Sequence, residues 1–411
     1  MKNADFTGFS RCFRGLVGLA MVLLLSAVLL PFAWAGEPSS VEEGNTAFAV
    51  KLYREVAKAE GNVALSPFSV STALAMTWAG ARGETAEEMR SVLGFGSEQQ
   101  AVHEAFAELQ AKLAKASEAD GVELNIANRL WGMTGHVFEA EFLRITREGY
   151  GAELEALDFS DAAKAAKTIN TWIEAQTKDR IKDLLAAGDL GPLTRLVLTN
   201  AVYFKGSWLV EFDPKATQEA SFFAPTGEVE VKMMFRKGEM RYGETDDAQL
   251  VSLPYRGEGI SMLLVLPKAK DGLGALEAKL DAELLSKWMG LGAKEKVKLW
   301  LPRFRLESTF SLGEALQALG MPSAFSEASA DFSGMTGRRG LYISAVLHKV
   351  FVEVNEEGTE AAAATAVVMK TRRAVESPPT PEFRADHPFL FLLCDDETGS
   401  ILFMGRVQQP D

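Results

Sequence analysis

The sequence predicts one large α+β domain, preceded by a short N-terminal segment that is not part of it. Apolar residues at helical spacing dominate the first part of this domain, and strand-like runs dominate the rest. The chain has 411 residues, of which 47% are hydrophobic and 24% charged, so it can bury a large core. No linker rich in proline or glycine divides it, and no repeat of about 20 to 50 residues is visible. These observations favour a single domain over residues 36–411.

Three helices are expected first. Apolar residues follow helical spacing from Phe48 to Val56. A second helix is expected after Ser66, whose side chain can cap the free amides of the first turn. A third is expected to begin at Thr85, with Glu88 completing a capping box.

Strands are expected in most of the remaining chain. Residues 124–131 alternate between apolar and polar side chains, which is typical of a strand. A helix that includes Ile169 and Leu184 follows, and then a nearly continuous apolar run at 196–204, which predicts a strand buried on both faces. Further strand-like runs lie at 250–254, 262–266, 297–304, 344–354, 389–393 and 401–405. The last two are joined by 395–399, a hairpin signal.

The N-terminal segment has the pattern of a secretory signal peptide. Basic residues precede an apolar run at 16–30, and Ala33-Trp34-Ala35 offers a cleavage site before Gly36. An uncleaved membrane anchor is the alternative, but the run is short for a membrane span. We therefore expect residues 1–35 to be removed and the protein to be secreted or periplasmic.

Charge and cysteine content limit the possible partners. The formal net charge is −13, which argues against nucleic acid, heparin-like polyanions and anionic membranes as main partners. Of the two cysteines, Cys12 lies in the signal segment and Cys394 in the domain. No internal disulfide is therefore expected in the mature protein.

No catalytic constellation is visible in the sequence. The four histidines are His103, His136, His348 and His387, and no motif for hydrolysis, nucleotide binding or metal binding accompanies them. An exported hydrolase is the enzyme alternative, and it lacks a recognisable nucleophile and base. We expect no enzymatic activity, no cofactor and no metal.

The stretch from Glu356 to Arg373 follows the strand-like run 344–354 and has a strand pattern of its own. Alternate residues from Thr359 place one uncharged face along it, consisting of Thr359, Ala361, Ala363, Thr365, Val367 and Met369. Such a segment can enter a sheet without burying a charge. A flexible alanine-rich linker is the alternative.

This stretch resembles the reactive-centre loop of the serpins, a family of protease inhibitors. In that family a Glu-Glu-Gly-Thr-Glu-Ala-Ala-Ala-Ala-Thr hinge marks the inhibitory members, and this chain matches at every position. The matching residues are Glu356, Glu357, Gly358, Thr359, Glu360, Ala361, Ala362, Ala363, Ala364 and Thr365. The resemblance extends over nearly all of residues 45–407.

The resemblance implies a particular version of the α+β class. The serpin fold has a large central, mostly antiparallel sheet, two further sheets, about eight to nine helices and an exposed loop, here at about residues 356–381.

The resemblance also implies a buried polar cluster beneath the central strands, called the shutter. Its members would be Ser66, Ser69, Asn200 and His348. His348 shares a strand face with Val346 and Val350, so we expect it to be buried and hydrogen-bonded. A core histidine with no role in strand movement is the alternative.

Two further residues are implied at the place where the loop would enter the sheet, called the breach. Trp208 matches the family's breach tryptophan, and Arg303 matches a basic position that pairs with the hinge glutamate, here Glu356. The alternative for that pair is a surface salt bridge of little energetic weight.

The function that the resemblance implies is inhibition of serine proteases by a suicide-substrate mechanism. The protease cleaves the loop, the hinge enters the main sheet, and the acyl-enzyme is trapped. A monomer is expected. No heparin-like activator is expected, because residues 98–120 carry more acidic than basic side chains. The alternative is a non-inhibitory serpin that acts as a chaperone, carrier or storage protein.

Family spacing places the reactive bond at Arg372-Arg373, which suits a trypsin-like protease. Two other basic positions compete for this assignment. Cleavage after Arg373 would suit a subtilisin-like protease with dibasic preference, and Lys370-Thr371 is the third possible bond.

Overall fold

The structure is a computed structural model that describes residues 40–96, 98–117, 121–257, 259–359 and 379–410. The described residues belong to one unit of the chain, Pro38–Asp411. The signal peptide expected at 1–35 lies outside them. Among the described residues, no helix is both long and apolar enough to cross a membrane.

The described residues form ten α-helices and three short 3-10 helices. The α-helices are α1 (Val41–Val56), α2 (Pro67–Trp78), α3 (Gly83–Leu93), α4 (Gln99–Ser117), α5 (Ala140–Tyr150), α6 (Ala162–Gln176), α7 (Leu273–Lys279), α8 (Ala282–Gly290), α9 (Gly313–Leu319) and α10 (Ser333–Thr336). The 3-10 helices are η1 (Ala187–Asp189), η2 (Pro214–Ala216) and η3 (Ser323–Phe325).

Fifteen strands accompany these helices in the described residues. They are β1 (Val63–Leu65), β2 (Val122–Met133), β3 (Leu154–Leu157), β4 (Leu196–Ser207), β5 (Gln218–Ala224), β6 (Gly227–Glu244), β7 (Ala248–Pro254), β8 (Ile260–Pro267), β9 (Ala293–Pro302), β10 (Phe304–Ser311), β11 (Ile343–Val354), β12 (Gly358–Thr359), β13 (Glu382–Arg384), β14 (Phe389–Asp395) and β15 (Ile401–Val407).

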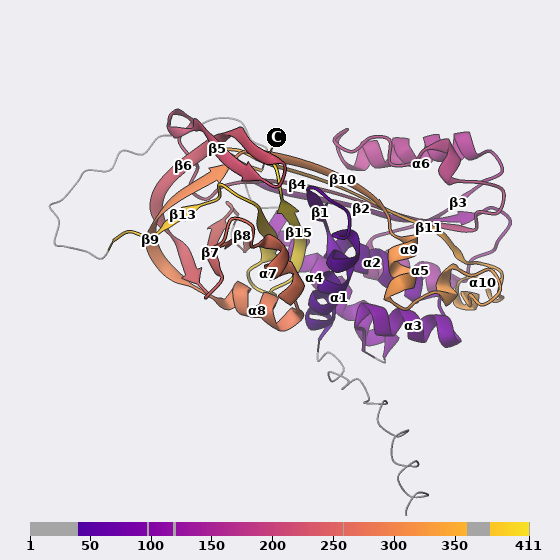
Figure 1. The fold of residues 1–411 in the computed structure, drawn as a ribbon. Helices are drawn as coiled ribbons and strands as arrows, with labels where there is room; N and C mark the ends of the chain where they lie inside the picture. Colours follow the sequence, from indigo (N-terminus) through magenta and orange to yellow (C-terminus); the bar gives the residue numbers. More distant parts are fainter. Residues whose placement is uncertain (1–39, 97, 118–120, 258, 360–378, 411) are drawn as a thin grey trace, which may run out of the picture. The chain divides into compact units, whose positions relative to one another are not determined.

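The strands form two hydrogen-bonded sheets (Figure 1). The six-stranded sheet has the order β10-β11-β4-β2-β3, with β12 beside β4. Its central neighbours β4 and β11 are parallel, whereas β10 is antiparallel to β11 and β2 is antiparallel to β4. The nine-stranded sheet has the order β1-β15-β14-β8-β7-β6-β9-β13, with β5 beside β6.

The predicted α+β class is confirmed, and the arrangement of sheets and helices that the resemblance implies is present with two differences in detail. The two smaller sheets expected beside the central sheet are continuous with each other. They join because the 18-residue strand β6 pairs with β5, β9 and β7 along its length. The described residues also contain ten α-helices rather than eight or nine, because short elements such as α10, with four residues, add to the number.

The six-stranded sheet is covered on both faces. In Figure 1, α6 lies on one side of this sheet, and the N-terminal helices α1 to α5 lie on the other. Ala201 and Tyr203 of β4 pack with apolar residues of α6, while Leu198 and Val202 belong to the larger core. This two-sided burial explains why the sequence of β4 is a nearly continuous apolar run.

The predicted start of the third helix is wrong by two residues. Helix α3 begins at Gly83, and no side chain caps its first turn. Thr85 and Glu88 instead accept hydrogen bonds from a later segment: Thr85 from the amide of Asp331, and Glu88 from the amide and hydroxyl of Ser323. A polar pair that fits a capping box locally is therefore used for tertiary contacts.

Two other element boundaries differ from the sequence prediction. Helix α6 ends at Gln176, so Ile181 and Leu184 lie in an irregular segment that still packs its apolar side chains against β4 and β11. The apolar run 297–304 also divides at Arg303, because β9 belongs to the nine-stranded sheet and β10 to the six-stranded sheet. The apolar pattern of this run predicts that it is buried, but it does not show where the chain passes from one sheet to the other.

Cys394 is the free cysteine of the described part of the chain, and it is buried in β14. Its Sγ lies 3.5 Å from the Sδ of Met289. Burial raises the pKa of this thiol, with a further contribution from Asp396 and Asp395. Cys394 therefore packs as an apolar side chain rather than as a reactive thiolate.

Candidate functional site

The central feature of the site is the seam between β4 and β11. These parallel strands pair from Leu196–Ile343 to Tyr203–Phe351, and then they separate. At that end β12 pairs antiparallel with β4, with Gly358 opposite Ser207 and Thr359 opposite Gly206. A strand that continued from β12 along β4 would replace the pairing between β4 and β11.

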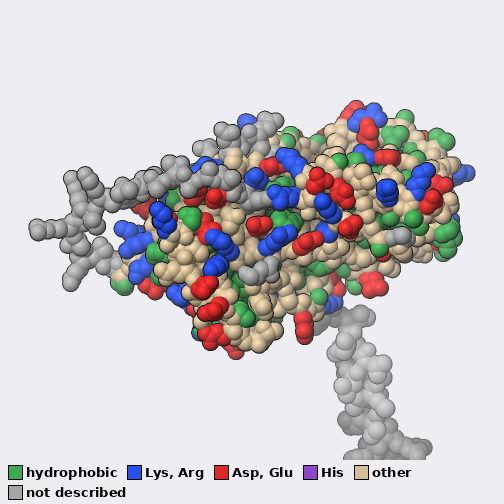
Figure 2. Space-filling view, turned by 90° about the horizontal axis from the view of Figure 1, so that it is seen from above, with side chains coloured by type: hydrophobic (Ala, Val, Ile, Leu, Met, Phe, Trp, Pro, Cys, Tyr) green, Lys and Arg blue, Asp and Glu red, His purple; other side chains and the backbone are tan. Residues whose placement is uncertain are grey.

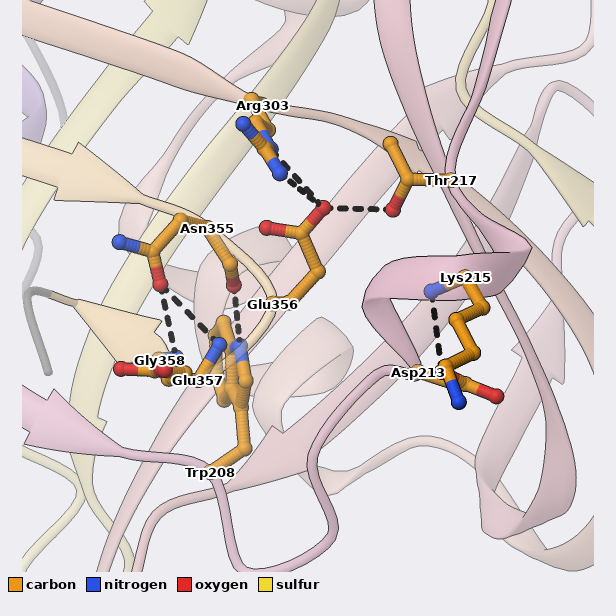
Figure 3. Close-up of polar contacts among 9 residues, drawn as sticks. All are labelled: Trp208, Asp213, Lys215, Thr217, Arg303, Asn355, Glu356, Glu357 and Gly358. Carbon is orange, nitrogen blue, oxygen red and sulfur yellow. Dashed lines mark hydrogen bonds and ion pairs between the residues drawn. The ribbon is translucent and has the colours of Figure 1, made fainter. Parts of the chain in front are cut away.

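A tight turn reverses the chain between β11 and β12 (Figure 3). The amide of Asn355 donates to the carbonyl of Gly358 at 2.8 Å. The side-chain Oδ1 of Asn355 accepts from the amides of Glu357 and Gly358 at 3.1 and 3.3 Å. Gly358 has a φ of +149°, and a Cβ atom there would lie 1.9 Å from the carbonyl oxygen of Gly206. Only glycine fits this position.

The segment after β4 holds the backbone of this turn. The amide of Trp208 donates to the carbonyl of Glu357 at 2.8 Å, and the amide of Phe212 donates to the carbonyl of Glu356 at 2.9 Å. The indole Nε1 of Trp208 donates to the carbonyl of Asn355 at 3.0 Å. Trp208 is therefore a structural anchor of the hinge as well as a buried aromatic residue.

The Glu356 carboxylate is buried beside the turn and paired with Arg303 (Figure 3). Its Oε1 accepts from Nε and Nη2 of Arg303 at 2.9 and 2.6 Å, and from Oγ1 of Thr217 at 2.5 Å. Burial by itself raises the pKa of Glu356, but these hydrogen bonds outweigh it, so the pKa is lowered. The pair is thus more than a surface salt bridge, because one partner is buried.

Thr359 is fully buried at the entrance to the seam. Its Oγ1 lies 2.9 Å from the hydroxyl of Tyr255, and the Tyr255 ring stacks on Trp208 with ring centroids 4.4 Å apart. Burial raises the pKa of Tyr255, so its hydroxyl stays protonated. The first inward-facing hinge residue therefore already occupies a position inside the sheet.

A polar row crosses the middle of the seam. His348 of β11 lies opposite Asn200 of β4, which lies opposite Asn128 of β2. The amide of Ser66 donates to Nε2 of His348 at 3.0 Å, so Nε2 is unprotonated. The proton is therefore on Nδ1, which donates to the side-chain oxygen of Asn200. His348 is neutral and fully buried, and burial lowers its pKa to about 3.

The row is completed by residues of α2 and β2. The side-chain nitrogen of Asn200 donates to Oγ of Ser69 and to the side-chain oxygen of Asn128. Ser66 caps α2 and donates its hydroxyl to the carbonyl of Leu402 at 2.6 Å. The structure therefore brings together Ser66, Ser69, Asn200 and His348, and it adds Asn128.

The contribution of His348 to stability should depend on pH. The unfolded chain takes up a proton below about pH 6.5, whereas the folded His348 stays neutral down to about pH 3. The free energy of unfolding should therefore fall as the pH falls from 6.5, by about 1.4 kcal/mol per pH unit from this group. We expect His348→Gln to reduce that slope by about this amount in urea titrations between pH 7 and pH 5. The hydrogen bonds that this variant loses lower its free energy of unfolding at every pH, so they do not change the slope. An unchanged slope would therefore contradict the assignment of His348 as a buried, neutral histidine.

Three members of the site were not predicted from the sequence. They are Thr217, Tyr255 and Asn128, each of which makes a hydrogen bond described above. Asn128 was detectable as a polar side chain within the alternating run 124–131, but nothing local showed its partner.

Residues 360–378 of the predicted loop lie outside the described residues. This applies to the hinge positions Glu360, Ala361, Ala362, Ala363, Ala364 and Thr365, to Lys370, and to the expected reactive bond Arg372-Arg373. The structure places only the first four hinge residues, Glu356 to Thr359.

The fold and the site define an α+β protein in which the short strand β12 pairs with β4 at the end where the central strands β4 and β11 separate. A sequence model of the family described as Serpin (serine protease inhibitor) matches residues 43–410. The chain is 43% identical over 376 residues to an uncharacterised serpin-like protein from Thermococcus kodakarensis, covering 91% of this chain and 87% of that protein. It is 40% identical over 382 residues to the leukocyte elastase inhibitor of Homo sapiens, covering 90% and 99%. The chain therefore belongs to the serpin family.

A solved structure supports the same conclusion. Human thyroxine-binding globulin, in complex with its thyroxine ligand, superposes with a TM-score of 0.81 at 33% sequence identity. The match covers 90% of this chain and 98% of that one. Members of the family thus include a protein named as an elastase inhibitor and one named for binding thyroxine.

Proposed function

We propose that this protein inhibits serine proteases as a suicide substrate. The observation that carries the proposal is the position of Gly358 and Thr359, which already pair with β4 where β4 and β11 separate. The sequence that follows Thr359 keeps one uncharged face as far as Met369. It is suited to continue the strand that β12 begins. The signal-peptide pattern of the N-terminal segment supports action outside the cytoplasm. We propose that the protein acts as a monomer.

The protease supplies the chemistry of the first step. Its active-site serine attacks the carbonyl carbon of Arg372, the Arg372-Arg373 peptide bond breaks, and an acyl-enzyme ester forms. The part of the loop N-terminal to the break stays attached to the protease. This part is then free to move as a strand into the seam.

Strand insertion supplies the free energy for trapping the protease. Each inserted residue replaces the single parallel ladder between β4 and β11 by antiparallel ladders on both sides. About ten additional ladder hydrogen bonds at ~1 kcal/mol each give on the order of 10 kcal/mol. Insertion of a strand between β4 and β11 must break the His348–Asn200 hydrogen bond, which joins these two strands. The shutter therefore sets part of the barrier.

Arg372 is proposed as the residue that enters the protease specificity pocket, which favours a trypsin-like target. Incubation with trypsin should give a covalent complex that survives a denaturing gel, together with a small C-terminal fragment. N-terminal sequencing of that fragment should begin at Arg373. A start at Ala374 would move the reactive bond by one residue and favour a dibasic-cleaving protease, and a start at Thr371 would move it to Lys370-Thr371. Trypsin with a blocked serine is the control. Complete cleavage with no covalent complex would contradict the inhibitory function.

The remaining alternative is a non-inhibitory member of the family that carries or stores a ligand. Such a protein needs no strand insertion, so its hinge can contain charged side chains. The two functions differ in what loop cleavage does to the free energy of unfolding: insertion of the cleaved loop would raise it, whereas a carrier without insertion would show no rise.

A further inference from the structure

The strands β6, β9 and β13 present a cationic face outward, although the protein as a whole is acidic. β6 pairs antiparallel with β9, and β9 pairs parallel with β13, so residues opposite each other lie on the same face. The inward face is buried and includes Met240, Leu299 and Phe383. In Figure 2, Lys and Arg side chains gather at the end of the molecule where Figure 1 shows these strands. We call their outward side the β6–β9–β13 face.

The strand register determines which charges meet on this face. Lys237 lies opposite Lys298, Arg241 opposite Lys294, and Glu239 opposite Lys296. Two of these three pairs join like charges, which destabilises a sheet. β6 and β9 therefore carry more positive charge on this face than they neutralise between them.

Some of these cations have partners within the protein. Lys298 pairs with Glu382 at 2.7 Å, and the charge of Arg241 acts on Asp396. The remaining three lysines of the two strands, Lys237, Lys294 and Lys296, form no ion pair within the described part of the chain. They are also exposed, so they are available to a partner molecule.

An aromatic pair lies on the same face, next to β13. Phe235 is opposite Trp300, and their ring centroids are 4.9 Å apart. The guanidinium of Arg384, which is paired with Asp386, lies 5.3 Å from the ring centroid of Trp300. Both aromatic rings are only partly buried. Aromatic residues and arginine are enriched in protein–protein interfaces, so this composition is typical of a surface that binds another protein.

The β6–β9–β13 face directly follows the proposed reactive loop in the chain. The described chain resumes at Pro379, and the amide of Lys298 donates to the carbonyl of Pro381 at 2.9 Å. The proposed reactive residue, Arg372, is seven residues before Pro379, and the chain between them can span at most about 25 Å. A globular domain of about 200 residues is about 40 Å across. A protease bound at Arg372 is therefore close enough to contact this face.

We propose that the β6–β9–β13 face docks the target protease, and that this protease carries clustered Asp and Glu side chains beside its active-site cleft. The proposal rests on the proposed inhibitory function, because it describes the target of that function. The formal net charge of this chain is −13, so most of its surface would repel an acidic protease. Attraction to the cationic face would orient the protease toward the loop and raise the association rate.

The charge of the loop argues against this chain's own loop as the occupant of the face. Residues 360–378 contain three cations, Lys370, Arg372 and Arg373, and two carboxylates, Glu360 and Glu376. A segment with net positive charge does not complement a cationic surface. We therefore assign the face to a separate, acidic molecule.

Anionic and cationic trypsin are suitable probes, because both cleave after Arg and they differ in the sign of their net charge. The wild type should form a covalent complex about tenfold faster with anionic than with cationic trypsin at low salt. The Debye length is about 30 Å in 0.01 M salt and about 3 Å in 1 M salt, so this preference should disappear in 1 M salt.

Replacing Lys237, Lys294 and Lys296 together by Gln tests the face itself. All three lysines are exposed, so the fold should stay intact. At low salt we expect this triple variant to react about tenfold more slowly than the wild type with anionic trypsin, and no more slowly with cationic trypsin.

A matched control makes the same change in net charge away from the face. It replaces Lys164, Lys167 and Lys182 by Gln, which are exposed lysines of α6 and the segment after it. In Figure 1, α6 lies beside the six-stranded sheet, away from β9 and β13. The rates of this control should stay within about twofold of the wild type, because long-range charge effects are weaker than those of a docking surface.

A second measurement separates the docking surface from the inhibitory function. Trypsin whose active-site serine is replaced by alanine forms no acyl-enzyme, so its dissociation constant reports docking alone. The triple variant should bind inactive anionic trypsin about tenfold more weakly than the wild type. No measurable binding to the wild type, or equal dissociation constants for the two proteins, would overturn the docking surface whether or not active trypsin is trapped.

Two further outcomes are decisive. Docking that the triple variant loses, without any covalent complex with active trypsin, would support the surface and contradict the inhibitory function. Self-association of the wild type that the triple variant loses would assign the face to a second copy of this chain and overturn the proposal.

Discussion

We expect the Thr359→Arg variant to be cleaved by trypsin at the same bond as the wild type, yet to form less than about a tenth as much covalent complex. Thr359 is fully buried between β4 and Tyr255, and its hydroxyl is hydrogen-bonded to that tyrosine. A guanidinium at this position would have to be buried without a partner or stay outside the sheet. Insertion would then be too slow to compete with hydrolysis of the acyl-enzyme. The measurement is the ratio of complex to cleaved protein on a denaturing gel.

Two controls separate this effect from a general disturbance. Thr359→Ser keeps the hydroxyl that bonds to Tyr255, so its ratio should stay close to that of the wild type. Thr226→Arg places the same charge on an exposed turn between β5 and β6 and should also have little effect. A wild-type ratio for Thr359→Arg would show that insertion does not begin at β12.

Much of the fold could be predicted from the sequence because it depends on local patterns. The alternation at 124–131 and the continuous apolar run at 196–204 identify β2 and β4, and the acidic turn at 395–399 identifies the hairpin of β14 and β15. The ends of strands were less predictable where the chain passes from one sheet to the other. At Arg303 the chain changes sheets without a change of hydrophobicity, and Arg303 itself is then free to pair with Glu356.

The site could be predicted only in part, because its missing members are defined by register rather than by sequence. Asn128 meets Asn200 because of the pairing of β2 with β4, which no local pattern specifies. Tyr255 reaches Thr359 only because β12 turns back toward β4.

Cleavage of the loop without a trapped protease should make the protein more stable, and this result would separate the inhibitor from a carrier. If the cleaved loop adds a strand between β4 and β11, about ten new ladder hydrogen bonds would raise the free energy of unfolding by on the order of 10 kcal/mol. For a domain of this size, that corresponds to an increase in Tm on the order of 10 °C. Calorimetry of the protein before and after cleavage of the loop by a protease that it does not trap would measure the difference.

The Thr359→Arg variant provides the matched control for this measurement, because the same bond is cut while the inserted strand is blocked at its first inward-facing residue. Its Tm should change little on cleavage. An equal rise in the variant and the wild type would mean that the gain does not come from insertion at β12. If the Tm rises in neither protein, the carrier function is favoured. The pairing of β4 with β11 would then be permanent, and the His348–Asn200 hydrogen bond would only stabilise it.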